Sequence, residues 1–89
     1  MLSVNVSGYK YTVVLDGEEV GYITKLPDGK LLVKVQKEHL ENVKDIVNEF
    51  KNVEMMENGQ EKIRLLDSMQ ERGLLNEDDI VDILNHSKN

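Results

Sequence analysis

Residues 9–35 read YKYTVVLDGEEVGYITKLPDGKLLVKV, and this stretch decides the fold. Apolar and polar residues alternate with a period of two around two turn signals, Asp-Gly at 16–17 and Pro-Asp-Gly at 27–29. Glycine reaches the positive φ values that tight hairpin turns need, and proline presets φ at the first turn position. The stretch therefore predicts three antiparallel strands joined by two hairpins, a β-meander.

The tyrosines of this stretch share their strand positions with apolar residues. Tyr9 and Tyr11 alternate with Lys10 in the first predicted strand, and Tyr22 falls in phase with the apolar residues of the second. Because successive side chains of a strand point to opposite faces, we expect the tyrosines on the buried face and Lys10 on the open one. Residues 2–6 (LSVNV) alternate too, and the sequence leaves open whether they add a fourth strand.

After the meander, residues 38–51 have the periodicity of an amphipathic helix. Its apolar residues recur at steps of three and four: Leu40, Val43, Ile46, Val47 and Phe50. Such a helix would cover the apolar face of the meander. The pattern ends before residues 53–56, where we expect a short strand or an extended connector.

The last third of the chain predicts a helical hairpin over residues 61–86. Gly73 stands where a glycine commonly ends a helix, and Asn76 followed by Asp79 is typical of a capped helix start. One apolar stripe runs along both predicted helices: Ile63, Leu66, Met69, Leu74, Ile80, Ile83 and Leu84. A two-helix hairpin cannot bury this stripe alone, so it packs either on the meander or on another chain. We expect it to form the interface of a homodimer.

Residues 60–86 also follow a particular order of residue types. Apolar residues at three-residue steps precede Gly-Leu-Leu-Asn at 73–76 and Asp-Ile at 79–80. In this order they resemble the SHOCT domain, a short C-terminal module of bacterial and phage proteins. The lysine usual in the second helix of that family is missing, since residues 82–84 are Asp-Ile-Leu. The resemblance implies an oligomerisation or docking appendage without catalytic residues.

Length and composition favour a small α+β protein. The chain has 89 residues, a net charge of −6 and no cysteine, which excludes a disulfide scaffold and thiolate metal sites. We expect residues 1–59 to form a meander-plus-helix unit and residues 60–89 a C-terminal helical hairpin. Apolar runs are too short to span a membrane, and no basic segment precedes an apolar one near residue 1, so we expect a cytoplasmic protein without membrane contact.

Motifs for catalysis are missing from the sequence. It has no glycine-rich phosphate loop and no metalloprotease or serine-hydrolase signature. The two histidines, His39 and His86, lie far apart and are typical of ordinary surface residues, because a metal site needs several ligands. We therefore expect no enzyme activity, no cofactor and no metal site.

Charge divides the chain into two parts and suggests two candidate surfaces. Residues 1–37 carry a net charge of +1 and residues 38–89 a net charge of −7. The acidic cluster comprises Glu77, Asp78, Asp79 and Asp82. Either it completes the start of a helix, where the dipole favours acidic residues, or it mimics nucleic-acid phosphates. The lysine-bearing strands offer the other surface, a sheet face for nucleic acid: Lys10, Lys25 and Lys34. The acidic excess of the whole chain makes nucleic acid the less favoured partner.

These features together predict a small, acidic, non-catalytic protein-binding or regulatory module. Its partner would be another protein, and it would self-associate through the C-terminal hairpin. One variant is a phage or mobile-element protein whose carboxylates block a basic site on a host factor. The alternative is a nucleic-acid-binding protein that uses the lysine-bearing sheet face.

Overall fold

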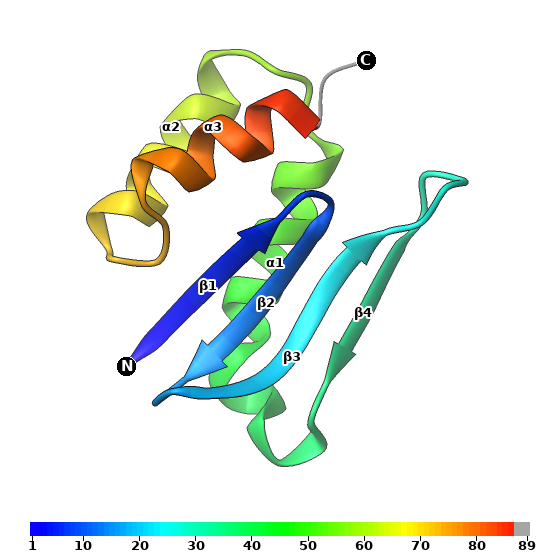
Figure 1. Ribbon diagram of the computed structural model, residues 1–89, viewed down its shortest axis with the longest axis vertical. Coiled ribbons are helices and arrows are strands. Elements are labelled where there is room, and N and C mark those ends of the chain that lie inside the picture. The colour runs from blue at the N-terminus through cyan, green and yellow to red at the C-terminus, as the bar shows by residue number, and fades with distance from the viewer. Residues whose placement is uncertain (87–89) are drawn as a thin grey trace.

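The computed structural model describes residues 1–86 and shows an α+β fold (Figure 1). Within these residues four antiparallel strands form one sheet in chain order: β1 (Leu2–Ser7), β2 (Lys10–Leu15), β3 (Glu18–Lys25) and β4 (Leu31–Val35). A 3₁₀ turn, η1 (Lys37–His39), leads into three helices: α1 (Leu40–Met55), α2 (Gln60–Glu71) and α3 (Glu77–His86). The meander and the helical hairpin are confirmed, and the open question at residues 2–6 is answered by β1.

Both predicted hairpin turns form. Asp16 and Gly17 have φ values of 51° and 84°, as in a type I′ turn. The backbone twist of this turn matches the twist of the two strands that it joins. In the β3–β4 turn the Leu26 amide donates to the Lys30 carbonyl at 2.8 Å, and Gly29 takes a φ of 89°. These two turns set the register of the central strands.

A β-bulge changes which residues of β3 face the core. Val13 pairs with Gly21 and Val14 with Glu19, so Val20 has no partner on β2. Val20 and Ile23 are therefore both buried although they are three residues apart. Tyr22 then lies on the opposite face, and the expectation that all the tyrosines share the buried face is wrong. Tyr11 alone is buried, since Tyr9 lies at the β1–β2 turn and is half exposed.

Helix α1 covers one face of the sheet and runs behind it in Figure 1. Its Phe50 ring lies 5.0 Å from the buried Tyr11 ring. The helix continues four residues further than predicted, because Val53 keeps the apolar spacing of Phe50 and is fully buried. The short strand or extended connector expected at residues 53–56 is therefore wrong for residues 53–55, which are helical.

Helix α3 lies beside β1, and α2 packs on α1 and α3 (Figure 1). The Leu74 carbonyl, in the turn between α2 and α3, accepts a hydrogen bond from the Val4 amide of β1 at 3.2 Å. Buried residues of the hairpin, among them Leu66 and Ile83, belong to the same apolar cluster as Val4, Tyr11 and Phe50. The boundary expected at residue 60 thus separates successive helices, but a single core continues across it.

Candidate functional site

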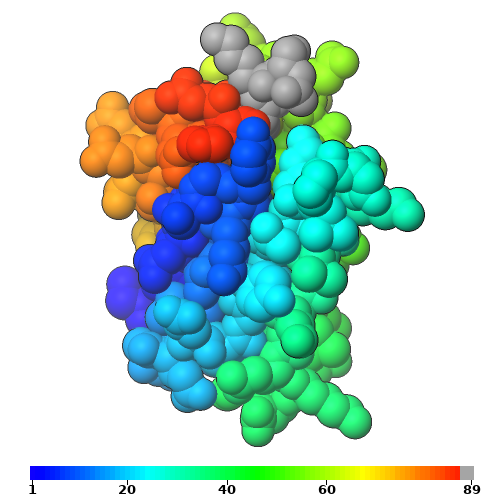
Figure 2. Space-filling model, turned by 45° about the vertical axis from the view of Figure 1, so that its right-hand side comes forward, coloured from blue at the N-terminus to red at the C-terminus, as the bar shows by residue number. Residues whose placement is uncertain are grey.

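The sheet has one face without a helix, and polar side chains populate it. Cross-strand pairing places Asn5, Thr12, Tyr22 and Lys34 in one row across all four strands, where Thr12 and Tyr22 are central. The neighbouring row consists of Ser7, Lys10, Thr24 and Leu32. In the space-filling view of Figure 2 the strand residues, blue to teal, form the centre of the visible surface, beside the orange and red α3. We call these two rows the open face.

Tyr22 is the centre of the open face. The Lys10 ammonium lies 4.7 Å from the centroid of its ring, a cation–π contact, and Lys34 pairs with Tyr22 from β4. A shallow hollow of about 290 Å³ lies beside the ring, and Lys10, Thr12 and Lys34 help to line it. The site offers an aromatic ring, two cations, the Glu19 carboxylate and hydroxyl groups, which together can bind a partner by stacking, charge and hydrogen bonds.

Only two of the three predicted lysines share this surface. Lys25 has the parity of the buried Ile23, so it points to the helix side of the sheet. There it lines a separate hollow of about 490 Å³ together with Tyr9, Pro27 and His86. Sequence reasoning grouped the lysines by strand, whereas the bulge and the pleat separate Lys25 from the other two.

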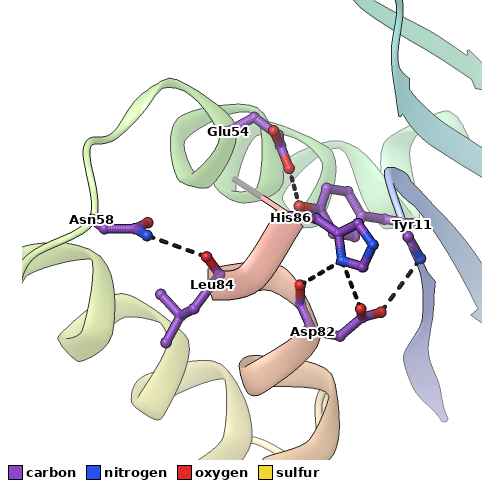
Figure 3. A network of polar contacts seen from close by, with 7 residues as sticks. Tyr11, Glu54, Asn58, Asp82, Leu84 and His86 are labelled. Atoms are coloured by element: carbon purple, nitrogen blue, oxygen red, sulfur yellow. Dashed lines mark hydrogen bonds and ion pairs between the residues drawn. The ribbon is translucent and has the colours of Figure 1, made fainter. Parts of the chain in front are cut away.

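Two of the four residues of the acidic cluster, Asp79 and Asp82, make hydrogen bonds within the chain. Asp79 accepts a hydrogen bond from the Asn76 amide at 3.0 Å, and the Asn76 side chain accepts one from the Asp79 amide at 2.8 Å. This reciprocal cap starts α3. Asp82 bonds the Gly8 amide and pairs with His86 Nδ1 at 2.7 Å (Figure 3). Glu77 and Asp78 remain as the exposed acidic side chains of the first turn.

The apolar stripe expected at a dimer interface lies mostly in the core of the same chain. Five of its members are at most 8% exposed: Leu66, Met69, Leu74, Ile80 and Ile83. Leu84 is partly buried, and Ile63 is 42% exposed. These five side chains have no free surface for a second chain, because they already cover β1 and α1. The intramolecular alternative is the one that the structure adopts.

The buried face of α2 contains a residue that the sequence analysis missed. Lys62 is fully buried in the phase of Leu66 and Met69, so the spacing of 62, 66 and 69 describes this face better than one starting at Ile63. Burial lowers the pKa of Lys62, and the Glu54 carboxylate acts against that shift. The sequence contains a signal for this burial, because the spacing of Lys62, Leu66 and Met69 places all three on the same side of the helix.

The Glu54 carboxylate that acts on Lys62 also makes a polar contact with β2, which Figure 3 shows. The Tyr11 hydroxyl of β2 donates to Glu54 Oε1 on α1, while Glu54 Oε2 is buried without a hydrogen-bond partner among the described residues. Burial, and then the Glu54 carboxylate, raise the pKa of Tyr11 far above its usual range. The Tyr11–Glu54 hydrogen bond ties β2 to α1, and Lys62 of α2 lies within the electrostatic influence of the same carboxylate.

Within residues 1–86, no set of three or more histidine, aspartate or glutamate side chains is arranged to hold a metal ion. His39 precedes α1, far along the chain from the Asp82–His86 pair, so the two histidines have separate surroundings. None of the described helices has the length and apolar character needed to cross a bilayer.

Comparison with protein-family models, with curated proteins and with solved structures finds no match. The resemblance of residues 60–86 to the SHOCT domain therefore stays a prediction.

Proposed function

We propose that this chain is a non-catalytic binding module and that its partner is a protein bound on the open face. The observation that carries the proposal is the position of Tyr22, exposed in part on a helix-free face between Lys10 and Lys34. The helices bury most of their apolar residues in the internal core, although Leu40, Met55, Ile63 and Val81 are exposed on them, and none of these four is aromatic. Tyrosine contributes a large, rigid contact area to protein interfaces at low cost in conformational entropy.

The chemistry of the open face favours a protein over nucleic acid. Its two rows carry two lysines, with threonine, serine and asparagine as the other polar members. Affinity for nucleic acid comes largely from neutralising several phosphates, and the chain as a whole has a net charge of −6. Hydroxyl and amide groups around one aromatic ring match the mixed polar character of transient protein interfaces.

Single-stranded nucleic acid is the second candidate, because the structure places Tyr22 on the same face as Lys10 and Lys34. An exposed aromatic ring with flanking cations is the arrangement on which unpaired bases stack. Binding of this kind weakens steeply as the salt concentration rises. Fluorescence anisotropy with labelled oligo-dT and oligo-rU at low salt tests it directly.

Selection of random displayed peptides on the immobilised protein tests the protein-binding proposal. We expect enriched peptides to bind the unaltered chain, and to lose that binding in Tyr22→Ala and Lys34→Glu variants. Tyr9→Ala and Lys44→Glu are matched controls, since they change an exposed tyrosine at a turn and an exposed lysine on α1. Peptides that bind the Tyr22→Ala variant undiminished would contradict the proposal, and oligonucleotide binding that depends on Tyr22 would favour the second candidate.

A further inference from the structure

Strand β4 is the outer edge of the sheet, and no helix or strand of residues 1–86 lies beyond it in Figure 1. Two hydrogen bonds fix the phase of its backbone: the Leu26 amide donates to the Lys30 carbonyl, and the Gln36 amide donates to the Val20 carbonyl at 2.9 Å. Antiparallel pairing alternates, so even-numbered residues of β4 bond to β3. The amides and carbonyls of Leu31, Val33 and Val35 consequently face outward.

The opposite edge of the sheet is treated differently. On β1 the outward Val4 amide donates to the Leu74 carbonyl, and α3 packs alongside the strand. The Asp82 carboxylate accepts a bond from the Gly8 amide at the end of this edge. In the described part of the chain, no bond from another element reaches the outward groups of β4. An edge with unpaired backbone groups is a template for an added strand.

The side chains of β4 are also incompletely covered by the rest of the chain. None of the five residues is buried: Leu31, Val33 and Val35 are partly covered on the helix side, and Leu32 is 42% exposed on the open face. An added strand would cover both sides at once. Its residues facing the helix side would meet the three partly covered apolar side chains, and its other residues would extend the open face.

Charge indicates what that strand should carry. Residues 30–37 read KLLVKVQK, with three lysines and no acidic residue. Lys34 projects from the open face, next to the position that alternate residues of an added strand would occupy. Opposite charges directly across neighbouring strands stabilise a sheet, and like charges destabilise it. The edge therefore suits a strand in which acidic residues alternate with apolar ones.

We infer that β4 is a docking edge for an extended acidic segment of a partner protein, which adds to the sheet as a further strand. The segment bonds to the outward amides and carbonyls of Leu31, Val33 and Val35. Its acidic residues lie beside Lys34, and its apolar residues pack on the helix side. This inference rests on the proposed protein-binding function and adds the mode of binding and the chemistry of the partner.

A second copy of the chain fits this edge less well. Antiparallel pairing of two β4 strands centred on Val33 would gather six lysines along one junction, three from each copy. Two chains with a net charge of −6 also repel each other as wholes. An acidic segment instead reduces the local positive charge.

The test uses the full chain and a fluorescent peptide with alternating Glu and Val, of about six residues, the usual length of a strand. Amide hydrogen exchange of the free protein should show slow exchange at Leu32 and Lys34 and fast exchange at Leu31, Val33 and Val35. Bound peptide should protect these three amides. A peptide with Lys in place of Glu is the control for charge.

Two variants separate the contribution of backbone hydrogen bonds to peptide binding from the contribution of charge. Val33→Pro removes one outward donor without touching a bond to β3, and proline is tolerated on sheet edges. We expect it to abolish peptide binding, while circular dichroism checks that the chain is folded. Lys34→Glu should weaken binding roughly tenfold, about what reversing one cross-strand charge pair provides. Lys44→Glu, on α1, should leave it unchanged.

Three outcomes would overturn the inference. The first is peptide binding that depends on Tyr22 but leaves the three amides of β4 unprotected, which would keep the proposed function and remove the edge from it. The second is the absence of binding by acidic peptides while peptides of other composition are selected on the open face. The third is protection of these amides without peptide in a chain that light scattering shows to be a dimer, because a second copy would then occupy the edge.

Discussion

Gly21 is the position where the smallest change should disturb the sheet most. It pairs with Val13 on β2 and with Val35 on β4, at the bulge. A Cβ atom placed there would lie 2.6 Å from the Lys34 carbonyl oxygen and 3.0 Å from the Val35 Cα atom. Both are backbone atoms, so no side-chain rotation relieves the overlap. Gly21→Ala must therefore push β4 away from β3 or distort the bulge.

The expected cost follows from two opposing effects. Inserting a methyl group where neighbouring atoms cannot move aside typically costs about 1–3 kcal/mol. Alanine also reduces the conformational freedom of the unfolded chain, which returns about 0.4–1 kcal/mol. The net destabilisation of Gly21→Ala should then be about 1–2 kcal/mol, or a fall in Tm of roughly 5–15 °C for a domain of this size.

Thermal and urea unfolding followed by circular dichroism measures this cost. Gly59→Ala is the matched control, because a Cβ there meets nothing within 4 Å and its φ of 172° is ordinary extended backbone. Glycine is preferred over alanine before the first turn of a helix, but the unfolded-state effect offsets that loss, so we expect little change. The reasoning fails if Gly21→Ala is as stable as Gly59→Ala and leaves the β4 amide resonances in place.

Three further substitutions probe the core and the caps. Tyr11→Phe should cost about 1–3 kcal/mol, because it removes the hydrogen bond that the Tyr11 hydroxyl donates to the partly buried Glu54 carboxylate. Folding keeps Tyr11 protonated, so its contribution is present below pH ~10, where unfolded tyrosine ionises, and stability should fall above it. The lowered pKa of Lys62 works in the opposite sense, and comparison with Tyr11→Phe in alkaline unfolding isolates the tyrosine. Asn76→Ala should cost ~1 kcal/mol in a urea titration by removing the cap of α3. Leu66→Ala should cost about 2–5 kcal/mol, whereas a side chain at an intermolecular contact would change the mass in solution instead.

The elements that the sequence predicted well are those with local causes. The two hairpin turns depend on residues within five positions of each other, and both formed. Helix α1 was found, but its end was placed too early, since Val53 continues the apolar phase across polar neighbours. Turn chemistry and helical periodicity act over a few residues, so they can be read without knowing the rest of the fold.

Features that depend on pairing across the sheet were harder to predict. A period-two reading assumes regular pairing, and the extra residue at Val20 breaks it, which moved Tyr22 to the open face. Nothing within β3 alone announces a bulge between two strands. The same limit applied to the lysines, because the face of Lys25 depends on that register. The open face therefore became visible only in three dimensions.

The path of α1 explains why the C-terminal hairpin packs on the β1 side of the sheet. Helix α1 begins beside β4, crosses behind the sheet and brings the chain to the β1 side, where α2 and α3 pack (Figure 1). The helices thus cover the edge formed by β1 and leave the edge formed by β4 bare. Residues 38–89 carry a net charge of −7. Much of this charge lies on α2 and α3, on the β1 side of the sheet and away from the lysines of residues 30–37. A partner segment with acidic residues would be attracted to one side of the sheet and repelled at the other, which gives it an orientation as well as a binding edge.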